Sequence, residues 1–245
     1  IISFFISFLI LKNQGIYILG NNKFLLLMRG VFGTIGLYFY FLIIQNIPLA
    51  TASIIIYITP IFTSIIGVFV LKEKINLLQS LCIFFAFLGI LLIQGFDHRV
   101  TIDYLVLGLV GSFCAGCAYN IIRYLRDKEH SLVLVIYFPM IAFPIAGIIS
   151  YFNWVNPSFN DLIILITIGI VTQIAQYFMT KSFQSEKVST VSIVSYTEII
   201  LVIAIGYQFF DETFNFLTYF GMFIVVISVV TSIIFSSKHT DQIDK

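Results

Sequence analysis

Eight long apolar runs, separated by short polar breaks, constrain the fold of this chain more than any other feature. The runs start near Phe24, Leu49, Asn76, Tyr104, Leu132, Leu162, Val188 and Phe214. Each is about 20 residues long, the length at which a helix crosses the hydrocarbon core of a membrane. Because 60% of the residues are hydrophobic and only 10% are charged, the chain has too few charged side chains to cover a soluble globule. The sequence therefore predicts an all-α membrane protein and argues against a soluble enzyme.

The two ends of the chain differ from these runs. Residues 1–11 are apolar, but about 20 residues are needed to cross the bilayer. We expect them to be the remainder of a ninth span that is cut at its start. Residues 237–245 are mostly polar, and we expect them to form a short cytoplasmic tail.

The basic residues predict the orientation of the spans, because Lys and Arg are retained on the cytoplasmic side during insertion. One set of alternate loops and helix ends contains Lys12, Lys23, Arg29, Lys72, Lys74, Arg123, Arg126, Lys128, Lys181, Lys187, Lys238 and Lys245. The other set contains only Arg99. This asymmetry supports the span boundaries, since one span more or fewer would scramble it, and it predicts a cytoplasmic C-terminus.

A second copy of the segment around residues 45–76 lies 139 residues further along the chain. At this offset, residue types that are scarce in the chain coincide without a gap: Gln45 with Gln184, Thr51 with Thr190, Ser53 with Ser192, Tyr57 with Tyr196, Gly67 with Gly206, Glu73 with Glu212 and Asn76 with Asn215. Chance similarity between two apolar segments is the alternative, but it would match mainly Ile and Phe. We therefore predict an internal repeat.

Five spans separate the two copies, so the copies cross the membrane in opposite directions. Such inverted repeats are typical of secondary transporters, in which the two copies exchange conformations and the opening moves from one face to the other. We predict two five-helix halves, residues 1–95 with spans two to five and residues 104–236 with spans six to ten. The full-length protein would have ten transmembrane helices, of which about nine are represented here.

The repeated segments also resemble a known family. Residues 48–73 contain Pro-Leu-Ala-Thr-Ala-Ser and Thr-Pro-Ile-Phe and close with Leu-Lys-Glu-Lys, which resembles the fourth span of the drug/metabolite transporter superfamily, EamA type. Residues 188–212, closing with Phe-Phe-Asp-Glu, resemble its ninth span. The pair Arg29-Gly30 and the triplet Tyr196-Thr197-Glu198 are similar to the branch that takes up S-adenosylmethionine. One departure is Cys82, where the second copy has Gly221. The resemblance implies a permease but names no substrate.

Glu198 is the one acidic residue in the middle of a predicted span. A charge at this depth costs about 2.5–3.5 kcal/mol on insertion scales, so the side chain should face the bundle interior or water. We interpret Glu198 as a carboxylate that binds substrate or accepts a coupling proton. The alternative is a purely structural role, with hydrogen bonds to the hydroxyls of Ser192, Ser195 or Thr197.

Several other polar side chains are candidates for substrate contacts. Arg29 lies inside the third span, where it could snorkel to the cytoplasmic surface or form an ion pair or anion contact. Tyr57 and Tyr196 could contact substrate or pack as aromatics, and Pro60 should kink the fourth span. Further intramembrane polar residues, which helix-to-helix hydrogen bonds would also explain, are Tyr119, Asn120, Gln173, Gln176 and Tyr177. Glu73 and Glu212 end the matched spans and could form gating or helix-capping contacts.

Other chemistry is not indicated. Cys114 and Cys117 have redox spacing but lie in an apolar span without basic neighbours that would lower a thiol pKa. The histidines fall in loops or the tail, and no phosphate-binding glycine loop is present. We therefore expect no catalytic residues, no metal, no cofactor and no enzymatic activity. The net charge of +1 offers no field that would attract nucleic acid.

Together these features predict a secondary transporter that moves a small polar metabolite by alternating access, coupled to protons or by exchange. The alternatives are a subunit of a lipid or glycolipid flippase and a membrane scaffold that does not transport. The expected partners are a small-molecule substrate and the lipid bilayer, and a homodimer is left open. We expect the protein in the bacterial inner (plasma) membrane.

Overall fold

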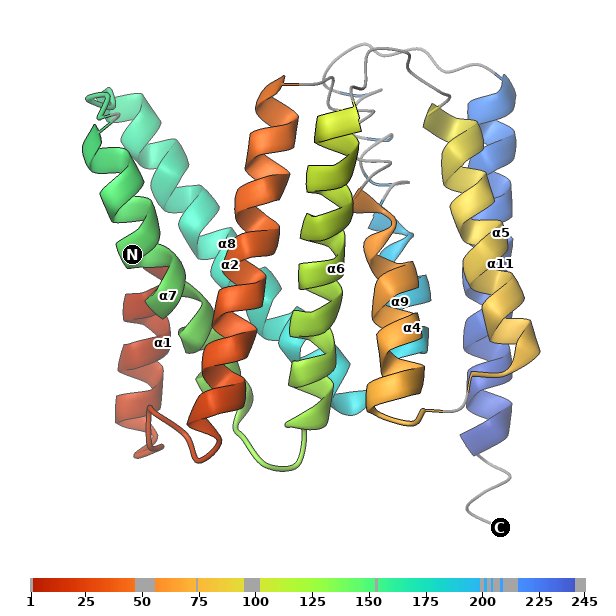
Figure 1. The fold of residues 1–245 in the computed structure, drawn as a ribbon, viewed down its shortest axis with the longest axis horizontal. Coiled ribbons are helices and arrows are strands. Elements are labelled where there is room, and N and C mark those ends of the chain that lie inside the picture. Colours follow the sequence, from red (N-terminus) through yellow and green to blue (C-terminus); the bar gives the residue numbers. More distant parts are fainter. Residues whose placement is uncertain are drawn as a thin grey trace. The chain divides into compact units, whose positions relative to one another are not determined.

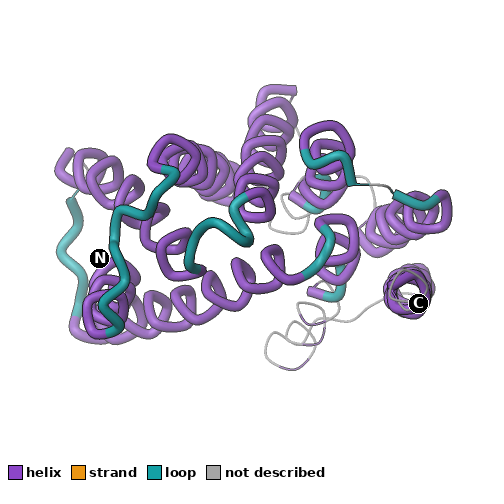
Figure 2. The backbone as a smooth tube through the Cα atoms, turned by 90° about the horizontal axis from the view of Figure 1, so that it is seen from below, coloured by secondary structure: helices purple, strands orange, loops and turns teal. Residues whose placement is uncertain are grey.

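The computed structural model describes residues 2–46, 56–73, 75–94, 102–152, 154–198 and 216–240, and the single positions 201, 204 and 208. All regular elements among these residues are helices (Figures 1 and 2). They are α1 (Ile2–Asn13), α2 (Lys23–Asn46), α4 (Thr59–Val70), α5 (Leu77–Gln94), α6 (Ile102–Tyr124), α7 (Ser131–Phe152), α8 (Phe159–Ser185), α9 (Val188–Ser195) and α11 (Phe216–Thr240). The predicted all-α class is confirmed.

The helices begin close to the predicted span starts. For example, α2 begins at Lys23, α7 at Ser131 and α9 at Val188. The predicted start near Leu49 lies outside the described residues. In the described part of the chain, α2, α6, α7 and α8 are long and apolar enough to cross a membrane. Large apolar side chains on α8 are exposed along residues 162–168, as expected where lipid is the solvent.

The chain divides into two compact units. Unit 1 comprises Ile1–Ile35 and Cys117–Glu186, and unit 2 comprises Gly36–Gly116 and Lys187–Lys245. In unit 1, α1, α7 and α8 pack against one another. In unit 2, α5 packs along α11 and α4 packs against α9 (Figure 1).

In unit 1, the N-terminal part of α7 forms the centre of the packing, since residues 131–137 are all buried. Helix α2 approaches it closely, because a Cβ atom at Gly30 would lie 2.7 Å from the Tyr137 carbonyl oxygen. Nearby, Glu129 Oε1 accepts hydrogen bonds from the backbone N–H groups of Asn21 and Asn22, at 2.7 and 2.6 Å. These contacts tie the start of α2 to the turn before α7.

Helix α8 begins with a capping box, just before the span predicted to start near Leu162. The Ser158 hydroxyl accepts a hydrogen bond from the Asp161 N–H, and the Asp161 carboxylate accepts one from the Ser158 N–H. The bonds that Asp161 accepts from Ser158 lower the pKa of its carboxyl below the ordinary value. The cap is therefore fully present above the ordinary pKa of Asp and is lost as the pH falls through the lowered one.

In unit 2, a small residue lets α5 and α11 approach closely. A Cβ atom at Gly89 would lie 2.8 Å from the Gly221 carbonyl oxygen and 2.9 Å from a methyl group of Val225. Without a hydrophobic driving force between helices in lipid, such close backbone contact is a main source of helix association.

We predict that Gly89→Leu destabilises the purified protein by about 1–3 kcal/mol, because the larger side chain cannot fit against α11. The melting temperature in detergent measures this change. Gly147→Leu is the matched control, since Gly147 is also a helical glycine but no atom lies within 4 Å of the position that a Cβ atom would occupy there. Equal melting temperatures for the two variants would contradict the packing described here.

Candidate functional site

In unit 2, the regular backbone hydrogen bonding of the helix is interrupted just before α4. Ile56 is helical, Tyr57 and Ile58 form a turn, and α4 then starts at Thr59. Pro60 lies in the first turn of α4, where its missing N–H leaves no helical hydrogen bond unmade. The Ile61 N–H bonds to the Ile58 carbonyl at 3.0 Å instead of to the Tyr57 carbonyl. The Tyr57 carbonyl therefore does not accept the helical hydrogen bond from the Ile61 N–H.

A second interruption lies 139 residues further along the chain, at the offset of the sequence match. Helix α9 ends at Ser195, and Tyr196 and Thr197 form a turn. Their N–H groups bond three residues back, to the carbonyls of Ile193 and Val194 at 3.1 and 3.0 Å. Tyr57 and Tyr196 are the pair matched at the offset of 139 residues. Both residues of the matched pair therefore lie in a turn between helical residues.

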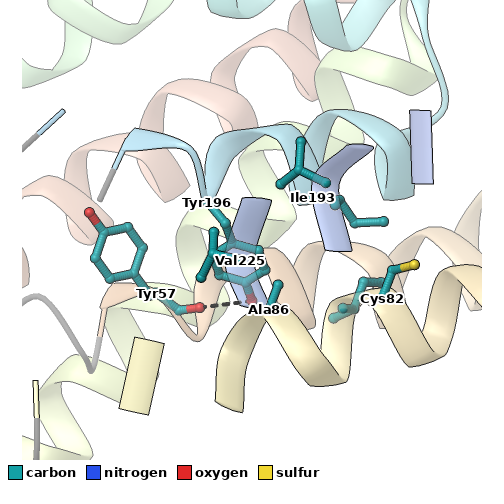
Figure 3. Close-up of a cluster of buried hydrophobic side chains, with 8 residues drawn as sticks. Tyr57, Cys82, Ala86, Ile193, Tyr196 and Val225 are labelled. Carbon is teal, nitrogen blue, oxygen red and sulfur yellow. Dashed lines mark hydrogen bonds between the residues drawn. The ribbon is translucent and has the colours of Figure 1, made fainter. Parts of the chain in front are cut away.

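The two interruptions are joined by one buried hydrogen bond. The Tyr196 hydroxyl donates to the Tyr57 carbonyl at 3.1 Å, and the ring centroids are 6.3 Å apart (Figure 3). The surroundings are apolar side chains of α5, α9 and α11: Cys82, Ile83, Ala86, Ile193, Val225 and Val229. An unsatisfied carbonyl there would have no water to replace its lost partner. We call this contact the tyrosine latch.

Glu198 follows the second interruption directly. Its side chain is exposed and lies within the range of electrostatic interaction with the side chains of Tyr57 and Tyr40. In the structural alternative, Glu198 would bond to the hydroxyls of Ser192, Ser195 or Thr197. Two of these hydroxyls instead form bonds with backbone carbonyls. Ser195 donates to the Val191 carbonyl at 2.9 Å, and Thr197 donates to the Val194 carbonyl at 2.7 Å. The buried Ser192 hydroxyl has no hydrogen-bond partner among the described residues.

Glu73 caps the helix that leads to this site. Its Oε2 atom accepts a hydrogen bond from the backbone N–H of Val188, the first residue of α9, at 3.0 Å. The preceding residue, Lys187, provides no side-chain cap. The predicted capping contact is therefore confirmed for Glu73, whereas Glu212 lies outside the described residues.

In unit 1, Arg29 is buried, with only 2% of its surface exposed. Its guanidinium lies over the Phe138 ring, with 5.2 Å from Cζ to the ring centroid, and one Nη atom donates to Gln176 Oε1 at 3.1 Å. The side chain therefore stays inside the unit and does not snorkel to its surface. Tyr119 is close enough for electrostatic interaction with Arg29, and its ring stacks on Phe183 at 4.6 Å.

The remaining predicted residues have other surroundings. Gln173 is buried and bonds to Ser7 at 2.7 Å and also to Ser3, so it links α8 to α1. Asn120 is buried in α6, and Tyr177 lies edge-on to Phe178. The structure thus groups Arg29, Tyr119 and Gln176, and separately Tyr57, Tyr196 and Glu198.

Sequence reasoning missed two residues that lie next to these groups, Tyr40 and Phe138. Tyr40 lies in an aromatic run at residues 38–41, and no sequence signal distinguishes it from its neighbours. Phe138 is one of 27 phenylalanines. Only its neighbour Pro139, inside α7, marks that region as unusual.

Comparison with known proteins agrees with these features. The family model described as the EamA-like transporter family matches residues 1–95 and 103–234. The pseudopaline exporter CntI of Pseudomonas aeruginosa (strain UCBPP-PA14) is 29% identical over 225 residues, which cover 91% of this chain and 79% of the exporter. The S-adenosylmethionine uptake transporter of Rickettsia prowazekii (strain Madrid E) is 24% identical over 221 residues, covering 89% of this chain and 74% of the relative.

A solved crystal structure shares the fold, with a TM-score of 0.80 at 14% sequence identity, covering 97% of this chain and 85% of that chain. The family and the names of these relatives are those of transporters, which agrees with the expectation that the chain is not an enzyme. The resemblance predicted from the repeated segments is confirmed. The chain belongs to the EamA-like transporter family, and it is an integral membrane protein of that family.

Proposed function

We propose that this protein is a secondary transporter that moves a small polar metabolite across the membrane by alternating access. The observation that supports this most strongly is the pair of matched interruptions at Tyr57 and Tyr196. Helices interrupted at corresponding positions of two inverted repeats are a common way in which transporters form a binding site near the bilayer midplane. The proposed repeats are residues 1–95 and 104–236.

In this proposal Glu198 recognises a cationic group of the solute or carries a coupling proton. A carboxylate that is exposed within a membrane protein and has two tyrosine hydroxyls nearby can gain and lose a proton or a ligand. Tyr57 and Tyr40 would then orient the carboxylate, and Pro60 would fix where α4 starts. Further contacts are proposed for Arg29, Tyr119, Asn120, Gln176 and Tyr177, and Gln173 would support them through its bonds to α1.

The tyrosine latch would stabilise one of the two conformations. It joins the turn before α4 to the turn after α9, and in the proposed repeat the hydroxyl comes from one copy while the carbonyl comes from the other. When the repeats exchange conformations, this asymmetric bond cannot be kept in the same form. Its loss would be offset only if another donor reaches the Tyr57 carbonyl.

The relatives support transport but differ in direction, since one is an exporter and another an uptake transporter. We therefore assign no direction. We place the protein in the bacterial inner membrane with a cytoplasmic C-terminus, because the basic residues concentrate on one side. The homodimer stays a hypothesis. A flippase subunit or a scaffold is the alternative function, and transport by this protein alone would distinguish them.

We predict that Glu198→Gln lowers transport by about tenfold or more, because a charged hydrogen-bonding partner is lost while the size is kept. Uptake and efflux of a labelled metabolite panel, including S-adenosylmethionine and cationic amino acids, provide the measurement over a range of pH. Glu186→Gln is the matched control, since Glu186 is exposed at the end of α8. Unchanged transport by Glu198→Gln at every pH would refute the charged role.

We predict that Tyr196→Phe lowers the free energy of unfolding by about 1–3 kcal/mol, because the Tyr57 carbonyl loses its partner in apolar surroundings. Tyr57→Phe removes a hydroxyl from the same cluster but keeps the latch, which uses the backbone carbonyl of that residue. Thermal unfolding of the two variants in detergent compares them directly. If both lose the same stability, the latch contributes nothing specific.

A further inference from the structure

The guanidinium of Arg29 is a buried positive charge without a negative partner among the described residues. Its side chain is 2% exposed, and no Asp or Glu of that part of the chain lies within ion-pair distance of it. Its Nε atom has no hydrogen-bond partner there either. Taking an arginine out of water is costly unless a counter-charge and further hydrogen bonds replace the solvent. The bonds that the described residues make to Arg29 are fewer than its five N–H donors require.

The surroundings hold the guanidinium in a fixed position. The Phe138 ring covers one face, and the oxygen of Gln176 accepts one N–H. A glycine leaves room on the helix itself, because a Cβ atom at Gly33 would lie 3.2 Å from an Nη atom of Arg29. A guanidinium that is already fixed loses little further entropy when it binds a ligand.

The guanidinium supplies the hydrogen-bond donors of this site. Gln176 accepts one of its N–H bonds through Oε1, and the amide N–H groups of Gln176 are further donors on the same side chain. Among the described residues no second Lys or Arg contacts the guanidinium, and so the local charge is a single positive one. A carboxylate matches this set, because it carries one negative charge and its planar pair of oxygens accepts two parallel N–H bonds. A phosphate group, with a charge near −2, would be left with uncompensated negative charge.

We propose that Arg29, assisted by Gln176, binds the carboxylate group of the transported solute, so that the substrates of this protein are carboxylate-bearing metabolites. This inference rests on the proposed transport function and names its substrate class. Arg29 is a binding residue in this scheme, and Phe138 and Gly33 are positioning residues that set the orientation of the guanidinium.

The transport arm of the test uses labelled amino acids and hydroxy acids, each paired with its methyl ester or amide. We expect transport of free acids to exceed that of the esters and amides in the parent protein. Arg29→Gln should lower transport of the free acid by about tenfold or more and abolish the preference. Arg29→Lys should restore part of it, since the charge is kept but the planar fork is lost. Arg123→Gln is the control, because Arg123 is also buried in unit 1 but donates to the Gln184 carbonyl.

The binding arm measures the melting temperature of purified protein with sodium acetate, glycine or glutamate, and with equimolar acetamide, chloride or phosphate. We expect carboxylates alone to stabilise the parent and the Arg123→Gln variant, and to have no effect on Arg29→Gln. This readout does not depend on transport, and it also reports whether each variant is folded.

The outcomes separate the two proposals. Transport that ignores esterification, or that Arg29→Gln leaves unchanged, would overturn the carboxylate site while the transport function stands. Absence of transport with carboxylate stabilisation intact would overturn the transport function and keep the binding site. Equal stabilisation by chloride or phosphate, or none by any carboxylate, would overturn the inference itself.

Discussion

The structure depends on one constraint: inside a membrane, each backbone polar group must find a partner within the protein. Helices meet this requirement along their length, but the turn at Tyr57 and Ile58 leaves the Tyr57 carbonyl without a helical hydrogen bond. The Tyr196 hydroxyl, from the turn that follows α9, satisfies it. The same bond therefore makes the interruption possible and fixes the distance between two interrupted helices. A site can form there because the backbone is irregular and still satisfied.

The same constraint applies to the ionisable side chains, which also need partners inside the protein. Glu198 lies within electrostatic range of Tyr57, and Arg29 lies beside an aromatic face and an amide oxygen. Glu73, which follows α4, caps α9, so its carboxylate satisfies a backbone N–H donor and is not itself left for a ligand. Gln173 forms hydrogen bonds with two serines of α1. A buried polar side chain can therefore also be satisfied by contacts between helices, without a ligand. The residues with incomplete hydrogen bonding are therefore the better candidates for ligand contacts.

The sequence was sufficient for the helical class and for helix starts such as those of α2, α7 and α9, because apolar length and polar breaks determine both. The start of α4 at Thr59 was not predicted. It also indicated Glu198 and Arg29, since charge is rare within the spans. It could not predict their neighbours. Proline marked the first interruption, but the second has no proline, and only the match of Tyr57 to Tyr196 pointed to it. Phe138 and Tyr40 became visible only in three dimensions, because aromatic residues are too common in this chain to distinguish a contact from packing.

The most direct test of the central claim is solute counterflow with the purified protein in proteoliposomes, without ATP and without a partner subunit. Vesicles would be loaded with an unlabelled metabolite and diluted into a trace of the labelled compound, across the same panel of solutes. A secondary transporter should accumulate label transiently above its equilibrium level, because the same site carries solute in both directions. Label that enters no faster than in protein-free vesicles, for every solute and with folded protein, would contradict the account and favour a flippase subunit or a scaffold.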